Sequence, residues 1–334
     1  MTMDRLWSLD RALDQPFTLW ALIALGAVLA IASAIIWGLQ VAGKLRAEQF
    51  QELRSRYFSW IVLTAILLAP LLAGAAWVML AVCVLSLLCY QEFARATGLF
   101  REKTIGVFAV LGILAVTFAN LDNYTRLFFA AGMCTTGFIT IATVHQDRPK
   151  GYIQRTALGV LGFALLGYSF GYLGLMANHS QFRPLLLLIV VATELNDVFA
   201  YCVGKTLGGP KLLPSTSPGK TVAGSVGALV LTTVLVAGLG HWVFAGTRVD
   251  EIHWLLILGL GVSVLGQFGD LLLSSIKRDL GLKDMGTILP GHGGLLDRFD
   301  SLVLVPPAVY HYLSLLLGPL NTLDQADRIL TGGS

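Results

Sequence analysis

Residues 58–91 read FSWIVLTAILLAPLLAGAAWVMLAVCVLSLLCYQ and contain no charged side chain. A helix needs about 20 mostly apolar residues to cross the hydrocarbon core of a bilayer, so this stretch is too long for one span. Pro70 and Gly74 stand near its middle, and both residue types interrupt helices. The stretch therefore predicts two membrane helices, over 58–73 and 75–91, joined by a tight turn.

The rest of the chain repeats this pattern. Of its 334 residues, 55% are hydrophobic and 13% are charged, whereas a soluble domain has about 25% charged residues. Apolar runs of sufficient length predict eight further helices, over 17–40, 105–120, 125–144, 156–176, 184–204, 221–246, 253–276 and 301–319. The predicted fold class is an all-α, polytopic integral membrane protein with about ten transmembrane helices.

The basic residues of the loops support this count, because Lys and Arg accumulate on the cytoplasmic side of membranes. With ten spans, every strongly basic loop falls on the same side. These loops contain Lys44, Arg46, Arg54 and Arg56; Arg95, Arg101 and Lys103; Arg148, Lys150 and Arg155; Lys205, Lys211 and Lys220; and Lys277, Arg278, Lys283 and Arg298. We therefore expect a multi-pass protein of the cell inner (plasma) membrane, with both termini on the side opposite to the basic loops.

Composition also argues against several functions. The chain has no basic tract interleaved with aromatic residues, so nucleic-acid binding finds no support. Cys83, Cys89, Cys134 and Cys202 lie in apolar runs without zinc spacing and are expected to be small buried hydrophobic residues. The first residues lack the pattern of a cleavable signal peptide, so we expect the first helix to be retained.

Polar residues gather first around the loop that follows 184–204. Asn196 and Asp197 lie inside this apolar run, where acidic groups are costly and usually serve function. The segment Ser217-Pro218-Gly219-Lys220-Thr221 precedes the next helix and combines a glycine, a lysine and hydroxyls, which suit a phosphate. It is not a P-loop, because Pro214 stands where the first glycine is required. Taken alone, it is equally well explained as a solvated loop between two helices.

The last basic loop carries the stronger pattern. Asp270, Ser274 and Lys277 share one helix face at i, i+4 and i+7, which suits a metal ion beside a phosphate. Asp297 and Asp300 are three residues apart at the start of the last helix, again on one face. Two carboxylates so spaced can hold Mg²⁺, which takes oxygen ligands and often bridges to substrate phosphates.

Simpler explanations exist for most of these residues. Asp297 and Asp300 can stabilise a helix N-terminus through its dipole, Lys277 can be an ordinary cytoplasmic anchor, and a lone loop histidine such as His292 is more often a hydrogen-bonding residue than a catalyst. These explanations do not account for Asp270, which lies within an apolar run. Further cations that can neutralise phosphate charge are Arg278, Lys283 and Arg298.

The stretch from Ser274 to Asp300 resembles the signature of the phosphatidate cytidylyltransferases, also called CDP-diacylglycerol synthases. It reads Ser-x-hydrophobic-Lys-Arg, then Lys283-Asp284, then hydrophobic-Pro-x-His-Gly-Gly-hydrophobic-x-Asp-Arg-hydrophobic-Asp. Asn196-Asp197 with Ala200-Tyr201, and Ser217 to Thr221, resemble upstream motifs of the family in the same order. One departure is Ala223, where family members generally carry Glu or Gln.

The resemblance also predicts how the chain is organised. Residues 1–53 form an N-terminal extension with an extra transmembrane helix, and 54–320 form the cytidylyltransferase membrane domain. Residues 321–334 form a short polar tail.

The resemblance implies a reaction and roles for the residues. CMP is transferred from CTP to phosphatidate, which gives CDP-diacylglycerol and pyrophosphate for phospholipid biosynthesis at the cytoplasmic membrane face. Mg²⁺ is required, a second metal ion is an option, and a homodimer is left open. Asp270, Asp297 and Asp300 are the predicted metal ligands and, with Lys277, the catalytic residues. The predicted substrate contacts are Asn196, Asp197, Ser217, Lys220, Thr221, Ser274, Arg278, Lys283, His292 and Arg298.

Two alternatives come from other functional classes. A CTP-dependent lipid or polyprenol kinase would transfer the γ-phosphate of CTP, so label from the α-position would not enter the lipid. A non-catalytic paralogue would bind lipid or nucleotide only. The DGxxAR…GxxxDxxxD pattern of the CDP-alcohol phosphatidyltransferases is absent from the sequence.

Overall fold

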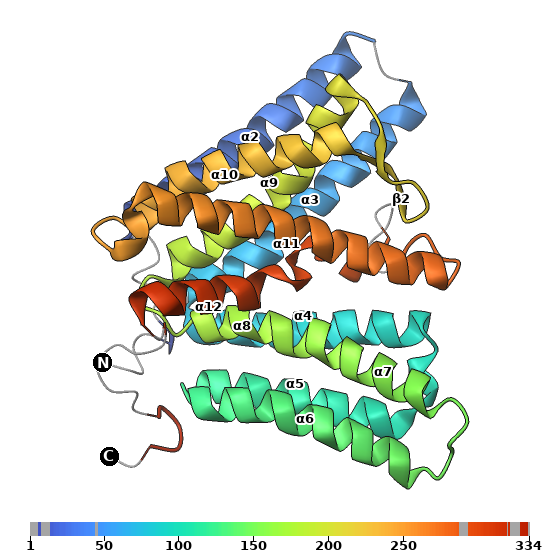
Figure 1. Ribbon diagram of the computed structural model, residues 1–334. Helices are drawn as coiled ribbons and strands as arrows, with labels where there is room; N and C mark the ends of the chain where they lie inside the picture. Colours follow the sequence, from blue (N-terminus) through green and yellow to red (C-terminus); the bar gives the residue numbers. More distant parts are fainter. Residues whose placement is uncertain are drawn as a thin grey trace.

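The computed structural model describes residues 6–7, 14–43, 46–286, 293–318, 320 and 328–332. Within these ranges the chain is almost entirely helical (Figure 1). Nine helical segments of the described residues are long and apolar enough to cross a membrane, and a shorter apolar segment covers Ser301–Leu317. These observations confirm the prediction of an all-α, multi-pass membrane protein.

The long segments alternate in direction through the bundle (Figure 1). They are α2 (Pro16–Val41), α3 (Ala47–Ala73), α4 (Ala75–Ala96), α5 (Lys103–Leu121), α6 (Thr125–His145), α7 (Tyr152–Gly162) with the π-helical η2 (Phe163–Tyr168) and α8 (Ser169–Met176), α9 (Phe182–Leu207), α10 (Val222–Val243) and α11 (Ile252–Asp279). As a result, the connections predicted to be basic lie at one end of the bundle, on the right of Figure 1.

A small β-hairpin marks this end, which we call the hairpin end. β1 (Lys211–Leu213) pairs antiparallel with β2 (Ser217–Thr221). The sequence predicts a loop here, since strands of three and five residues give almost no periodic signal. The hairpin brings the Ser217–Thr221 motif beside the C-terminal parts of α9 and α11.

The turn predicted between the second and third spans lies at Gly74. Gly74 has a φ of 134°, a region that favours glycine, and it separates α3 from α4. Pro70 remains inside α3. The buried side chain of Arg183 on α9 donates from Nε to the Leu71 carbonyl at 3.1 Å and from Nη2 to the Leu72 carbonyl at 3.4 Å. Arg183 therefore satisfies carbonyl groups that the end of a helix leaves without partners.

We expect Arg183→Met to lower the free energy of unfolding by about 1–3 kcal/mol, because it leaves buried carbonyl groups without donors. The measurement is the thermal unfolding midpoint of the purified protein in detergent. Arg126→Met is the matched control, since Arg126 is exposed near the start of α6. Equal midpoints for the two variants would contradict this role of Arg183.

The last apolar segment is shorter than the predicted span over 301–319. It consists of a 3-10 turn, η5 (Ser301–Val303), and α12 (Val305–Leu317). The 13 residues of α12 extend about 20 Å, which is less than the roughly 30 Å hydrocarbon core of a bilayer. Pro306 occupies its first turn, where a missing N–H costs little. The tenth helix is therefore present, but it is a short one.

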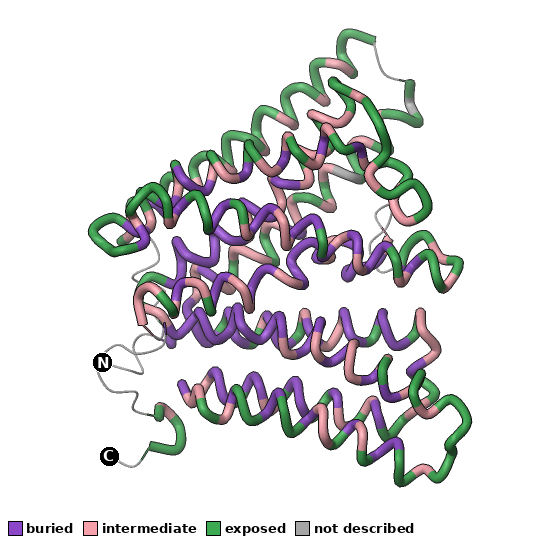
Figure 2. Tube along the Cα trace, in the orientation of Figure 1, coloured by how far each residue is buried: buried purple, intermediate pink, exposed green. Residues whose placement is uncertain are grey.

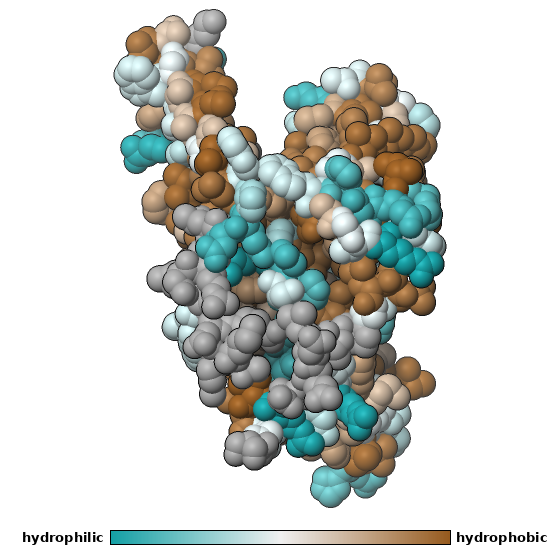
Figure 3. All heavy atoms as spheres, turned by 90° about the vertical axis from the view of Figure 1, so that its left-hand side faces the viewer, coloured by the Kyte–Doolittle hydropathy of each residue, from teal (hydrophilic) through white to brown (hydrophobic). Residues whose placement is uncertain are grey.

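The helices form two groups that meet around α12. One group contains α4 to α8, the other contains α9, α10 and α11, and α12 contacts α8, α9 and α11. α2 and α3 lie at the edge of the bundle and are largely exposed, whereas α4 and α8 are mostly buried (Figure 2). A view onto the end opposite the hairpin shows hydrophobic residues around the flanks and hydrophilic residues toward the middle (Figure 3). This distribution suits a bundle with lipid on its sides.

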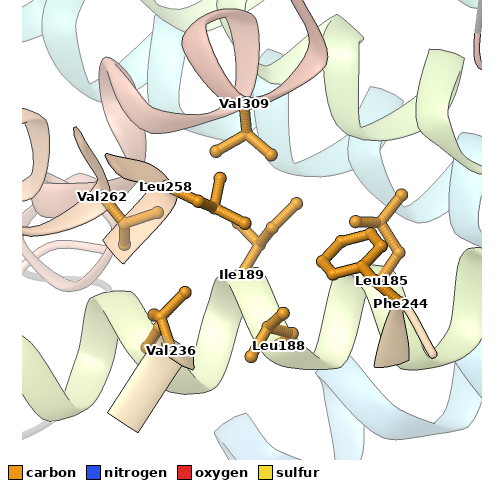
Figure 4. A pocket seen from close by; sticks show the side chains of 9 residues that line it. Leu185, Leu188, Ile189, Val236, Phe244, Leu258, Val262 and Val309 are labelled. Carbon is orange, nitrogen blue, oxygen red and sulfur yellow. The ribbon is translucent and has the colours of Figure 1, made fainter. Parts of the chain in front are cut away.

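Two features of the interior need no functional explanation. A small void among α9, α10, α11 and α12 is lined by nine apolar residues, including Ile189, Val236 and Leu258 (Figure 4). Since a bound water needs two to four polar partners, the void is a dry packing defect. Cys83 and Cys89 are buried as predicted, but the prediction was wrong for Cys134 and Cys202. These two lie on the outer sides of α6 and α9.

Part of the predicted polar tail is anchored to the bundle. The backbone N–H groups of Leu330 and Thr331 donate to Asp122 Oδ1 at 2.6 and 2.9 Å. The guanidinium carbon of Arg328 lies 4.5 Å from the ring centroid of Tyr124, within the range of a cation–π interaction. The described residues 328–332 therefore cap the turn between α5 and α6.

Candidate active site

Polar residues of the two predicted motif loops come together at the hairpin end, where the two helix groups meet. Four elements supply them: α9, the hairpin with the start of α10, the C-terminal half of α11, and the turn over 293–301. The residues concerned are Asn196, Asp197, Lys220, Thr221, Asp270, Ser274, Lys277, Asp297 and Asp300.

An ion pair joins the two motif loops. Lys220 Nζ lies 2.5 Å from Asp270 Oδ2, and Ser274 Oγ donates to Asp270 Oδ1 at 3.1 Å. The second contact shows that Asp270 and Ser274 share a face of α11, as their spacing predicts. Lys220 is therefore held in place by a carboxylate from a helix that lies 50 residues further along the chain.

A second group of charges lies at the end of α11. Lys277 Nζ is 3.0 Å from Asp297 Oδ1 and 3.6 Å from Asp300 Oδ2. Lys277 and Asp297 are only 7% and 9% exposed, and buried charges are stable only when paired. An anchor at the membrane surface would be exposed, so burial argues against that explanation for Lys277.

Asp297 lies in the 3-10 turn η4 (Leu296–Arg298) and Asp300 is the N-cap residue of η5, so the two do not share one face of the last helix. The sequence prediction was wrong on this point because α12 begins only at Val305. Asp297 Oδ2 accepts the N–H groups of Met285 at 2.8 Å and Gly294 at 2.9 Å. Asp300 Oδ1 accepts the Ser301 N–H at 2.9 Å. The two carboxylates are close together because both face Lys277, and not because they share a helix face.

Asn196 and Asp197 have different environments despite being neighbours. Asp197 Oδ2 accepts a hydrogen bond from Ser301 Oγ, whereas its Oδ1 is buried and has no hydrogen-bond partner among the described residues. Asn196 is fully buried, and its Oδ1 accepts from Thr232 Oγ1 at 3.0 Å and Ser263 Oγ at 2.6 Å. Asn196 thus links α9 to α10 and α11, and its contact with a substrate stays a prediction.

Four aspartates and two lysines form the group that we call the charge cluster: Asp197, Asp270, Asp297, Asp300, Lys220 and Lys277. Burial and, next, the charge of Asp270 raise the pKa of Asp300 well above its ordinary range, although Lys277 opposes this shift. A bound cation would relieve this repulsion, and carboxylate oxygens are the ligands that Mg²⁺ prefers. In the described part of the chain, no three His, Cys, Asp or Glu side chains stand close enough to form a metal site by themselves. The chemistry of the donors fits Mg²⁺, and the predicted ligand set stays a prediction.

The hairpin residues are placed by close packing of α9 and α10. Thr221 Oγ1 accepts the Gly224 N–H at 3.1 Å and caps α10. A Cβ at Gly224 would lie 2.4 Å from the Ala200 carbonyl oxygen, so only glycine lets the two helices approach here. Ser217 is half-buried in β2, and Ala223 is half-buried in the first turn of α10.

The remaining predicted contacts are Arg278, Lys283, Arg298 and His292. Arg278 is exposed, and its Nε donates to the Thr216 carbonyl at 3.2 Å, which ties α11 to the hairpin. Lys283 is exposed and Arg298 is half-buried. His292 lies outside the described residues, so its predicted role is not tested.

Glu92, on α4, is not among the site residues predicted from the sequence. This carboxylate is 3% exposed and accepts the N–H groups of Leu295 at 3.0 Å and Leu296 at 2.8 Å. Its position beside the basic loop after α4 is typical of a solvated charge at a helix end. A contact between residues that are 203 positions apart in the sequence cannot be predicted from local spacing.

Comparison with known proteins identifies the family of this chain. The model of the Cytidylyltransferase family matches residues 54–316. The phosphatidate cytidylyltransferase of Staphylococcus saprophyticus is 30% identical over 256 residues, which cover 76% of this chain and 96% of that protein. The phosphatidate cytidylyltransferase of Bacillus subtilis is 35% identical over 225 residues, which cover 67% of this chain and 72% of that protein.

A further relative is YnbB of Escherichia coli, an uncharacterized protein. It is 29% identical over 306 residues, which cover 89% of this chain and 96% of YnbB. The family match spans well over half of the chain and includes every residue of the charge cluster. This chain belongs to the cytidylyltransferase family.

Proposed function

We propose that the protein transfers CMP from CTP to phosphatidate, which gives CDP-diacylglycerol and pyrophosphate. The observation that carries this proposal is the charge cluster at the hairpin end, in which Lys220 meets Asp270 and Lys277 meets Asp297 and Asp300. Membership of the family supports the use of CTP. The names of the Staphylococcus and Bacillus relatives support phosphatidate as the acceptor.

The reaction needs positioned phosphates more than covalent catalysis. An oxygen of the lipid phosphate attacks the α-phosphorus of CTP in line. A new phosphorus–oxygen bond forms, the bond from the α-phosphorus to the bridging oxygen breaks, and pyrophosphate leaves. The attacking phosphate is already ionised, so no strong general base is required. Lys220, Lys277 and Arg278 are proposed to contact phosphates, with Ser217 and Thr221 as hydrogen-bond donors.

Asp270, Asp297 and Asp300 are the proposed ligands of Mg²⁺. Asp197 Oδ1, which has no hydrogen-bond partner among the described residues, is proposed as a further oxygen ligand. Bound Mg²⁺ supplies charge neutralisation for the transferring and leaving phosphates. Lys277 is proposed to keep Asp297 and Asp300 oriented through its ion pairs with both carboxylates.

The site is proposed to face the cytoplasm. The alternating helices put the basic connections at the hairpin end (Figure 1), and basic loops accumulate on the cytoplasmic side of membranes. Soluble CTP and a lipid headgroup can meet at that surface.

The purified protein in mixed micelles of detergent and phosphatidate tests the proposed function. With CTP labelled at the α-phosphorus and Mg²⁺, we expect label in the lipid fraction, and with γ-labelled CTP none. Chelation of divalent metals should reduce the rate by about 100-fold or more, because several kcal/mol of charge stabilisation are lost. Label from the γ-position would indicate a lipid kinase, and no label from either position would overturn the proposal in favour of a non-catalytic protein.

A further inference from the structure

The Glu92 carboxylate joins the first helix group to the turn that carries Asp297. Its Oε1 accepts the Leu295 N–H and its Oε2 accepts the Leu296 N–H, so both oxygens are engaged. Leu295 is the N-cap residue of η4 and Leu296 is its first residue, and Asp297 follows directly. A displacement of Leu295 and Leu296 would therefore also displace Asp297.

Two glycines show how closely the turn packs on this carboxylate. A Cβ at Gly286 would lie 2.4 Å from Glu92 Oε1, and a Cβ at Gly294 would lie 2.6 Å from Glu92 Oε2. Both distances are shorter than real Cβ atoms show. The backbone at Gly286 and Gly294 thus packs directly against Glu92, and a Cβ at either position would require the carboxylate or the backbone to shift.

Asp297 organises the same turn from within. It accepts the N–H groups of Met285 and Gly294, so Glu92 and Asp297 together accept three backbone N–H groups of the turn and that of Met285. Asp297 also faces Lys277 through its other oxygen. Two contacts therefore hold the turn. Glu92 binds the N–H groups of Leu295 and Leu296, and Lys277 binds the Asp297 carboxylate.

We propose that Glu92 is a positioning residue of the active site, which holds the turn so that Asp297 and Asp300 face Lys277. The kinetic part of this inference rests on the proposed function, and the structural part does not. A carboxylate suits this position because each of its two oxygens faces one of the two N–H groups. A glutamine has one acceptor oxygen, and its NH₂ group would face a backbone N–H.

The experiment compares Glu92→Gln with Glu102→Gln in the full-length protein in detergent. Glu102 is half-buried at the same end of the bundle and lies outside the charge cluster, with Arg155 Nε at 3.9 Å. Hydrogen exchange of peptides that cover 293–301 reports on the turn without any need for activity. We expect at least about tenfold faster exchange there in Glu92→Gln only, since buried hydrogen-bonded N–H groups exchange through local opening.

Kinetics then separate positioning from general stability. We expect the Mg²⁺ concentration for half-maximal CDP-lipid synthesis to rise about 10–100-fold in Glu92→Gln, as for other residues that orient metal ligands. The KM for phosphatidate should change less than about twofold, and Glu92→Asp, which keeps the carboxylate, should recover part of the Mg²⁺ response. If Glu92→Gln does not fold, Gly286→Ala tests the same packing, with Gly106→Ala as control because a Cβ there meets nothing within 4 Å.

Each outcome decides one part of the inference. Unchanged exchange over 293–301 would overturn the contact between Glu92 and the turn. Faster exchange with an unchanged Mg²⁺ response would leave Glu92 a structural residue and overturn its role in the site. If the wild-type protein makes no CDP-lipid, the proposed function fails, while the exchange comparison still tests the role of Glu92 in fixing the turn.

Discussion

Asp297→Asn is expected to reduce CDP-lipid synthesis by about 10³-fold, which corresponds to about 4 kcal/mol of transition-state stabilisation. Asp297 uses one oxygen for Lys277 and the other for the N–H groups of Met285 and Gly294. Asparagine has only one acceptor oxygen, so its NH₂ group must face either the ammonium group or the two backbone N–H groups. The same change removes a charged oxygen from the proposed metal ligands.

The measurement is transfer of label from α-labelled CTP to lipid by the purified variant. Asp279→Asn is the matched control, since Asp279 is exposed at the end of α11 and lies outside the cluster. It should retain the wild-type rate within about twofold, because exposed substitutions away from a site usually have small effects. An Asp297→Asn variant as active as this control would remove Asp297 from the mechanism.

Lys277→Met is expected to affect stability as well as activity. Methionine approximates the length of lysine, but it leaves Asp297 and Asp300 without the ammonium group that lies 3.0 and 3.6 Å away. Removal of one partner from a buried ion pair typically costs 3–5 kcal/mol, since it leaves an uncompensated buried charge. We expect a lower thermal unfolding midpoint in detergent, and a loss of synthesis of about 10³-fold or more.

Lys205→Met provides the comparison, because Lys205 is exposed on α9 at the same end of the bundle. A Lys277→Met variant with the unfolding midpoint of Lys205→Met would show that the buried pair adds no stability. Wild-type synthesis by Lys277→Met would exclude Lys277 from phosphate binding. The double variant Lys277→Met with Asp297→Asn should be less destabilised than the two single changes added together, because the two residues interact directly.

The lengths of the apolar runs and the positions of turn residues were sufficient to predict most of the membrane fold. Each long helix has an apolar run of its own, and Gly74 divides the stretch that is too long for one span. The same reasoning overestimated the last helix, because hydropathy does not reveal that the chain turns twice between Leu296 and Leu304 before α12 begins. The β1–β2 hairpin was missed because its pairing depends on the neighbouring helices more than on its own short strands.

Local spacing predicted only those site contacts that one helix can make. Asp270 and Ser274 meet because they are four residues apart on α11. The contact of Lys220 with Asp270, and the joint contact of Asp297 and Asp300 with Lys277, depend on how separate elements pack. Asn196 has the sequence context of a site residue, yet it hydrogen-bonds between helices. The motif resemblance identified the residues of the cluster, but not the pairs that they form.

The long separation between Glu92 and its partners has a consequence for biosynthesis. A chain emerges from the ribosome N-terminus first, so α4 is made about 200 residues before Leu295 and Leu296. During that interval Glu92 lacks the two N–H groups that satisfy it, and an unsatisfied carboxylate is costly in an apolar environment. The end of α4 should therefore stay hydrated in a nascent chain until the final segment arrives, and closure of the active site should be among the last steps of assembly.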